Sequence, residues 1–122
     1  MKLPISPRLL ACCNFVAFGD RVADIGCDHA YLGIHLLLKG IATAVIAADI
    51  NEMPLQSAMR NAEKFGTREK MSFYLSDGAK NIPHEFDTMI CAGMGADTMV
   101  SILEGAPWLK SGNYKLDRKS VV

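Results

Sequence analysis

The sequence predicts an α/β fold built around a parallel sheet. Short apolar runs end in glycine or acidic residues, and segments with helical apolar spacing alternate with them along the chain. Such alternation is typical of strands joined by right-handed helical crossovers. The chain has 122 residues, of which 50% are hydrophobic and 21% charged, as expected for one small globular domain.

The expected elements can be placed in order from their boundary signals. Ser6-Pro7 is a typical helix start, and Gly40 and Gly66 are typical helix ends. The expected helices span residues 7–18, 30–39, 52–65 and 96–103, and the expected strands span 21–26, 43–49, 71–75 and 86–92. The predicted strand order is 3-2-1-4.

The end of the chain does not continue this pattern. Residues 110–116 have the composition of an approach to a fifth strand that the chain does not reach, which would leave the fourth strand as an open edge. Residues 117–122 have no apolar pattern, and their codons can match a common sequencing-adapter sequence. We therefore expect residues 1–116 to be the N-terminal part of a domain with an incomplete C-terminal half, and residues 117–122 to be a non-native tail.

Charge and cysteine usage narrow the function classes. Thirteen basic and thirteen acidic residues cancel, so the overall charge does not indicate a nucleic-acid partner. The four cysteines have no metal-ligand spacing, so we expect no metal and a reducing, cytoplasmic setting. The most apolar region, residues 32–50, is interrupted by charged and glycine residues, and we expect no membrane span.

The turn after the first strand is the strongest functional signal. Asp24 and Gly26 end an apolar run, Asp28 follows, and a helix begins directly afterwards. A strand, a glycine turn and a helix N-terminus in succession form the ligand-binding element of Rossmann-like folds. Gly26 could instead be an ordinary turn glycine, Asp28 only a helix cap, and His29 only structural.

The other strand ends carry matching residues. Asp49 ends the second strand about twenty residues after the glycine turn, where an acid can hold a ribose diol. Asp77-Gly78 ends the third strand, where an acid or its backbone can recognise an adenine amino group, and residues 93–95 (Gly-Met-Gly) end the fourth. Together these positions predict a site for a cofactor that contains adenosine.

The glycine pattern separates two cofactor classes. A dinucleotide fingerprint needs three glycines, but this turn keeps only Gly26 and places Asp28 where a pyrophosphate would pass. S-adenosylmethionine has no phosphate and carries a positive sulfonium and an ammonium, which Asp24 and Asp28 can complement. The residues therefore favour a methyltransferase. An NAD(P)-dependent oxidoreductase and a non-catalytic fragment remain the alternatives.

Four segments closely resemble the bacterial tRNA (adenine-22-N1)-methyltransferases, a class I S-adenosylmethionine-dependent family. These segments are VADIGCDHAYLGIHLL, AADINEMPLQSAMRNAEKFG, LSDGAKNI and DTMICAGMGADTMVSIL. The resemblance implies a cofactor site formed by Asp24, Gly26, Asp28, Tyr31, Asn51, Asp49, Asp77 and Gly78. It implies that the target base enters at Gly93, Met94 and Gly95, beside Asp28 and His29.

The resemblance also implies a modest chemical task. Adenine N1 is a lone-pair nucleophile at neutral pH, so positioning matters more than base catalysis. Asp28 or His29 is a candidate to remove the N6 proton after methylation. The family pattern is changed at Cys27, Gly33 and Ala96, none of which removes an essential functional group. The family continues into a helical C-terminal domain, through which we expect tRNA to be bound mainly.

Overall fold

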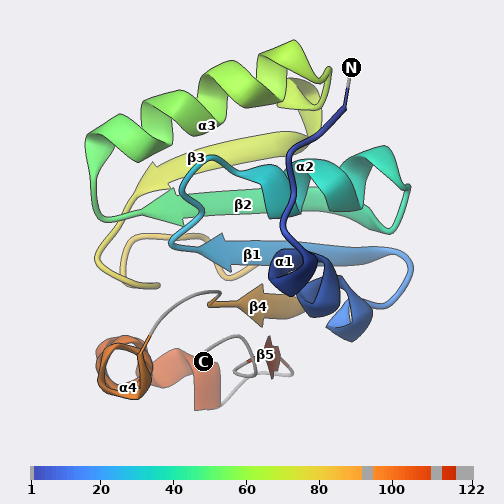
Figure 1. Ribbon diagram of the computed structural model, residues 1–122. Helices are drawn as coiled ribbons and strands as arrows, with labels where there is room; N and C mark the ends of the chain where they lie inside the picture. Colours follow the sequence, from blue (N-terminus) through green and yellow to red (C-terminus); the bar gives the residue numbers. More distant parts are fainter. Residues whose placement is uncertain (1, 92–94, 111–113, 118–122) are drawn as a thin grey trace.

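The computed structural model describes residues 2–91, 95–110 and 114–117. Its strands form one parallel sheet in the order β3-β2-β1-β4-β5 (Figure 1). The strands are β1 (Asp20–Ile25), β2 (Ala42–Asp49), β3 (Met71–Leu75), β4 (Thr88–Ile90) and β5 (Lys115–Asp117). The predicted order 3-2-1-4 is confirmed.

The expectation that the chain stops before a fifth strand is wrong. Residues Lys115–Asp117 form a strand that pairs in parallel with β4. In this pairing Thr88 lies opposite Lys115, and Ile90 lies opposite Asp117. The edge of β4 is therefore covered by a three-residue strand. The pairing includes Asp117, the first residue of the predicted tail, and the rest of that tail lies outside the described residues.

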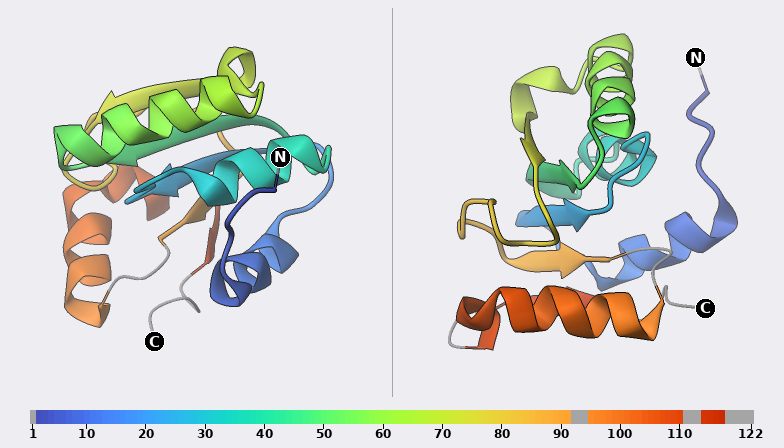
Figure 2. Two further views of the ribbon diagram at one scale, coloured as in Figure 1. Left: turned by 45° about the horizontal axis from the view of Figure 1, so that its top comes forward. Right: turned by 90° about the vertical axis from the view of Figure 1, so that its left-hand side faces the viewer.

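Helices cover both faces of the sheet. They are α1 (Pro7–Cys12), α2 (Tyr31–Leu38), α3 (Glu52–Lys64) and α4 (Ala96–Gly105), with short 3₁₀ turns η1 (Cys13–Phe15), η2 (Arg68–Lys70) and η3 (Pro107–Lys110). In Figure 2, α2 and α3 lie together on one side of the strands, and the segment after β3 lies on the other. None of the helices in the described residues is long and apolar enough to cross a membrane.

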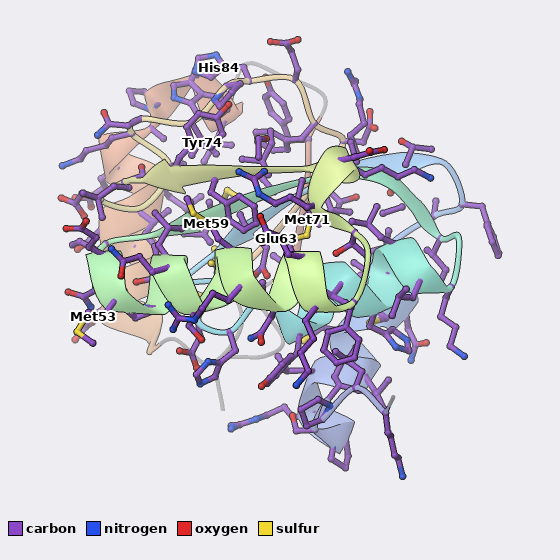
Figure 3. All side chains as sticks on the ribbon, turned by 90° about the horizontal axis from the view of Figure 1, so that it is seen from above. Met53, Met59, Glu63, Met71, Tyr74 and His84 are labelled. Atoms are coloured by element: carbon purple, nitrogen blue, oxygen red, sulfur yellow. The ribbon has the colours of Figure 1, made fainter. Side chains whose placement is uncertain are left out.

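Alternating side chains of the two central strands build two separate cores. Val22, Val45 and Ala47 pack with α1, α2 and α3, whereas Ala23 and Ile46 pack with α4 and the segment before β4. Because β1 and β2 are buried on both faces, their sequences are continuous apolar runs instead of alternating apolar and polar residues. Figure 3 shows the division from above: Met59 and Glu63 of α3 lie on one side of β3, and His84 lies on the other.

Two predicted boundaries differ from the structure. The first helix was expected to reach Phe18, but α1 ends at Cys12 and the 3₁₀ turn η1 follows, after which Val16 is extended. The fourth strand was expected over 86–92, but β4 covers only Thr88–Ile90. Phe86 packs instead against the rings of Trp108 and Tyr114, with centroid distances of 5.8 and 4.7 Å. Apolar character alone could not distinguish these core contacts from strand pairing.

Candidate functional site

The turn after β1 is tied to the end of β2 through the backbone. The N–H groups of Gly26 and Cys27 both donate to the Ala48 carbonyl, at 2.8 and 2.9 Å. Gly26, Asp28 and Ala30 have positive φ angles of 71°, 51° and 65°. A non-glycine residue adopts this conformation only when its surroundings hold it there.

Asp49 provides the second tie between the strand ends. Its Oδ2 accepts the Asp28 N–H at 3.2 Å, and its Oδ1 accepts the Asn51 N–H at 3.0 Å. One nearly buried carboxylate therefore holds the turn after β1 and also the start of α3. Both carboxylate oxygens retain lone pairs for a further donor, such as a diol hydroxyl.

Asp24 is a buried carboxyl group without a hydrogen bond among the described residues. Its residue is 2% exposed, and it lies in β1 one position before the strand ends. Burial raises the pKa of Asp24 to about 7, and the nearby charges of Asp49 and Asp28 add to this shift. A cationic group close to this carboxyl would stabilise its charged form.

The turn after β3 is organised by Ser76, which the sequence analysis did not single out. The Ser76 hydroxyl donates to the Gly78 carbonyl at 2.7 Å and accepts the Asn81 N–H at 3.0 Å. The Ser76 N–H donates to the Asp49 carbonyl at 2.9 Å. The Ser-Asp-Gly order, which favours hydroxyl-stabilised turns, was a signal that could have identified it.

The three turns enclose a crevice of about 110 Å³. Its lining residues come from β1, β2, the turn after β3, and α4: Ile25, Gly26, Asp49, Ile50, Ser76, Asp77, Gly78, Thr98 and Ile102. The backbone approaches closely here, because a Cβ added to Gly78 would lie 2.9 Å from Ile102 Cγ1. Sequence reasoning missed the apolar walls at Ile50 and Ile102, which carry no polar signal.

The other predicted site residues in the described part of the chain do not line this crevice. Asp28, His29, Tyr31 and Asn51 follow its lining residues Gly26 and Ile50 closely in the sequence. The His29 ring is 5.4 Å from the Tyr31 ring, and its Nδ1 shares a 2.9 Å hydrogen bond with Ser57 Oγ on α3. Gly95 is exposed directly before α4, and Gly93 and Met94 lie outside the described residues.

Comparison with known proteins identifies the family. The family model described as "Methyltransferase domain" matches residues 5–116. The chain belongs to this methyltransferase family. This match separates it from the NAD(P)-dependent oxidoreductases that the sequence analysis kept as an alternative.

The chain is similar to tRNA-modifying enzymes over nearly all its length. It is 35% identical over 116 residues to the Bacillus subtilis tRNA (adenine(22)-N(1))-methyltransferase. The alignment covers 94% of this chain and 49% of that protein. The crystal structure of the B. subtilis M1A22 tRNA methyltransferase matches with a TM-score of 0.88 at 35% identity, covering 94% of this chain and 50% of that one. The predicted resemblance is confirmed, and the chain spans about half the length of these relatives.

A related structure carries a cofactor product. The Mycoplasma capricolum homologue of that enzyme, in complex with S-adenosyl-homocysteine, matches with a TM-score of 0.77 at 35% identity. The match covers 82% of this chain and 46% of that one. A ribosomal protein L11 methyltransferase from Thermosipho melanesiensis is also 35% identical, over 94 residues that cover 77% of this chain and 35% of that protein.

Two buried thiols, Cys13 and Cys27, lie close enough to Asp24 for its charge to act on them. Burial raises the pKa of Cys13 to about 11, and the neighbouring Cys12 and Asp24 add to the shift. Burial also raises the pKa of Cys27, with further contributions from Asp24 and Asp49. These thiols are therefore protonated and unreactive near neutral pH.

The unusual state of Asp24 predicts a pH-dependent stability. The folded protein keeps the Asp24 proton up to about pH 7, whereas the unfolded chain loses it near pH 4. Wild-type unfolding free energy should therefore fall, relative to that of an Asp24→Asn variant, as the pH rises from about 4 to about 7. Urea unfolding at pH 5 and pH 8 measures the difference.

Asp77→Asn makes the same carboxylate-to-amide change at an exposed position and serves as the matched control. An Asp24→Asn difference from wild type that is equal at both pH values would contradict the buried, unpaired state of Asp24.

Proposed function

We propose that the protein catalyses S-adenosylmethionine-dependent methyl transfer to N1 of adenine 22 in tRNA. One observation carries this proposal: Asp49 joins the turn after β1 to the start of α3 at the edge of an acidic crevice, in a chain similar to enzymes named for that reaction. The named relatives support the substrate class, and the crevice supports the cofactor class.

The residues of the crevice fit an adenosine moiety. Asp49 has oxygens suited to the ribose diol, and Ile50 and Ile102 provide apolar surfaces for a flat base. Asp77 or the backbone at Gly78 is the proposed contact for the adenine amino group. Gly26 lines the crevice where the backbone can approach the ligand closely.

The methionine end of the cofactor fits the acidic side of the site. Asp24 is buried without a hydrogen bond and is close enough to Asp28 and Asp49 for their charges to raise its pKa. A sulfonium and an ammonium would relieve this repulsion between acids, whereas a pyrophosphate would increase it. We assign Tyr31 and Asn51 to the same cofactor site as supporting residues.

Bound S-adenosylmethionine supplies an electrophilic methyl group, and this chain's residues provide orientation. The adenine N1 lone pair needs no general base for its attack, so alignment is the main requirement and contributes roughly 7–11 kcal/mol in well-oriented reactions. We place the target base at Gly93, Met94 and Gly95. Asp28 or His29 is the proposed acceptor of the N6 proton after transfer.

The tRNA must present adenine 22 outside its stack for N1 to reach the crevice. The chain's equal numbers of acidic and basic residues provide little attraction for phosphates. We therefore assign the main tRNA contacts to the region that the relatives have beyond the matched half. A cytoplasmic location follows from a tRNA substrate.

Asp49 should be required for cofactor binding. An Asp49→Ala variant loses the carboxylate that holds Asp28 and Asn51 and would contact the ribose, so its affinity for S-adenosyl-homocysteine should fall at least about tenfold. Isothermal titration calorimetry measures this change. Glu63→Gln, an exposed change on α3, is the control and should bind like wild type. Equal affinity of wild type and Asp49→Ala would contradict the proposed cofactor site.

The substrate assignment predicts a position-specific reaction. Labelled methyl groups should pass from S-adenosylmethionine to a tRNA transcript with adenine at position 22, and a matched transcript with guanine there should accept none. High tRNA concentration and excess enzyme compensate for weak tRNA binding by this chain. Equal labelling of both transcripts, or of neither, would contradict the assignment.

A further inference from the structure

Helix α3 contacts the turn after β1 at two points on one helical face. Asn61 Nδ2 donates to the His29 carbonyl at 2.9 Å, and Ser57 Oγ shares a hydrogen bond of 2.9 Å with His29 Nδ1. Ser57 and Asn61 are four residues apart, so both project toward the turn from the same side of the helix. The backbone and the side chain of His29 are thus held by the same element.

We propose that Ser57 and Asn61 are positioning residues that hold the cofactor-binding turn in its binding conformation. This inference rests on the proposed function, because it assigns the turn to the cofactor. Neither residue lines the crevice, and the hydrogen bonds of both reach the turn at His29, so we assign them a role through His29 and no direct contact with the ligand.

The turn needs such support because of its backbone conformation. His29 lies between Asp28 and Ala30, which both have positive φ angles. These conformations are unfavourable for residues with a Cβ and persist only when contacts hold them. Helix α2 does not provide this hold through a cap, because its N-cap residue is Ala30 and no side chain caps the helix.

The contacts from α3 complement those from β2. The end of β2 holds Gly26 and Cys27 through the Ala48 carbonyl, and holds Asp28 through Asp49. The contacts from α3 begin at the next residue, His29, whose side chain is 51% exposed. Without Ser57 and Asn61, this second half of the turn would lose both hydrogen bonds to α3, while the Ala30 N–H bond to the Cys27 carbonyl and the Ile34 N–H bond to the Ala30 carbonyl would remain.

The same contacts place the imidazole of His29 beside Asp28. Its Nε2 lies 3.9 Å from Asp28 Oδ1, which is beyond hydrogen-bond distance, while its Nδ1 is engaged by Ser57. The ring therefore bridges α3 and the acidic side of the site. Its fixed orientation keeps the imidazole next to the Asp28 carboxylate.

The test combines ligand binding with hydrogen exchange in the purified chain. Ser57→Ala removes the hydroxyl, and Asn61→Asp replaces the donor with an acceptor of the same shape. Both variants should bind S-adenosyl-homocysteine roughly three- to tenfold more weakly, as expected for one lost hydrogen bond. In ligand-free protein, the Asp28 amide should exchange faster, while the urea unfolding midpoint stays close to that of wild type.

Two further variants separate positioning from a general effect on α3. Ser57→Thr keeps the hydroxyl, so this variant should retain the wild-type affinity for the ligand and the slow exchange of the Asp28 amide. Gln56→Ala removes the 3.3 Å hydrogen bond between Gln56 and Glu52, an exposed bond on the same helix that does not reach the turn, and should change neither readout.

The outcomes distinguish this inference from the proposed function. Wild-type chain that is folded but does not bind the ligand would contradict the proposed function, and the exchange of the Asp28 amide would still test whether α3 holds the turn. Wild-type affinity and unchanged exchange in both Ser57→Ala and Asn61→Asp would overturn the positioning role. Weaker binding with unchanged Asp28 exchange would also overturn it, because the turn would not have moved.

Discussion

The site depends on the hydrogen bond from the Asp28 N–H to Asp49 Oδ2. This bond joins the turn after β1 to the end of β2, and the second oxygen of the same carboxylate holds the Asn51 N–H at the start of α3. Parallel strands bring their carboxyl ends to one edge, but they do not by themselves fix the loops that follow. Asp49 therefore links three neighbouring parts of that edge into one arrangement.

Burial of charge is the second constraint. A lone carboxylate inside a protein is unfavourable, and Asp24 has no hydrogen bond among the described residues to offset its burial. The fold tolerates it because a raised pKa keeps the group largely neutral at acidic pH. A cationic ligand would favour the ionised form, which is why we propose Asp24 as part of the cofactor site.

The sheet and the polar residues at its edge were predictable from sequence, but the contacts between loops were not. The strands followed from apolar runs, their order from the assignment to a Rossmann-like fold, and Asp49 from its distance to Gly26. Ser57 and Asn61 carry no comparable signal, because polar residues on a helix are common and only the packed structure brings them to His29. β5 was missed because its three residues lack a pattern and are defined by pairing with β4.

The central claim is that the turns after β1, β2 and β3 form one cofactor site. A nitrogen-15 NMR titration of the chain with S-adenosyl-homocysteine tests it most directly. The largest shifts should fall on the amides of Asp28, Asn51 and Gly78, which belong to the three different turns. Shifts concentrated instead along the separate groove between α3 and β3, at Leu55, Met59 and Leu75, would contradict the account.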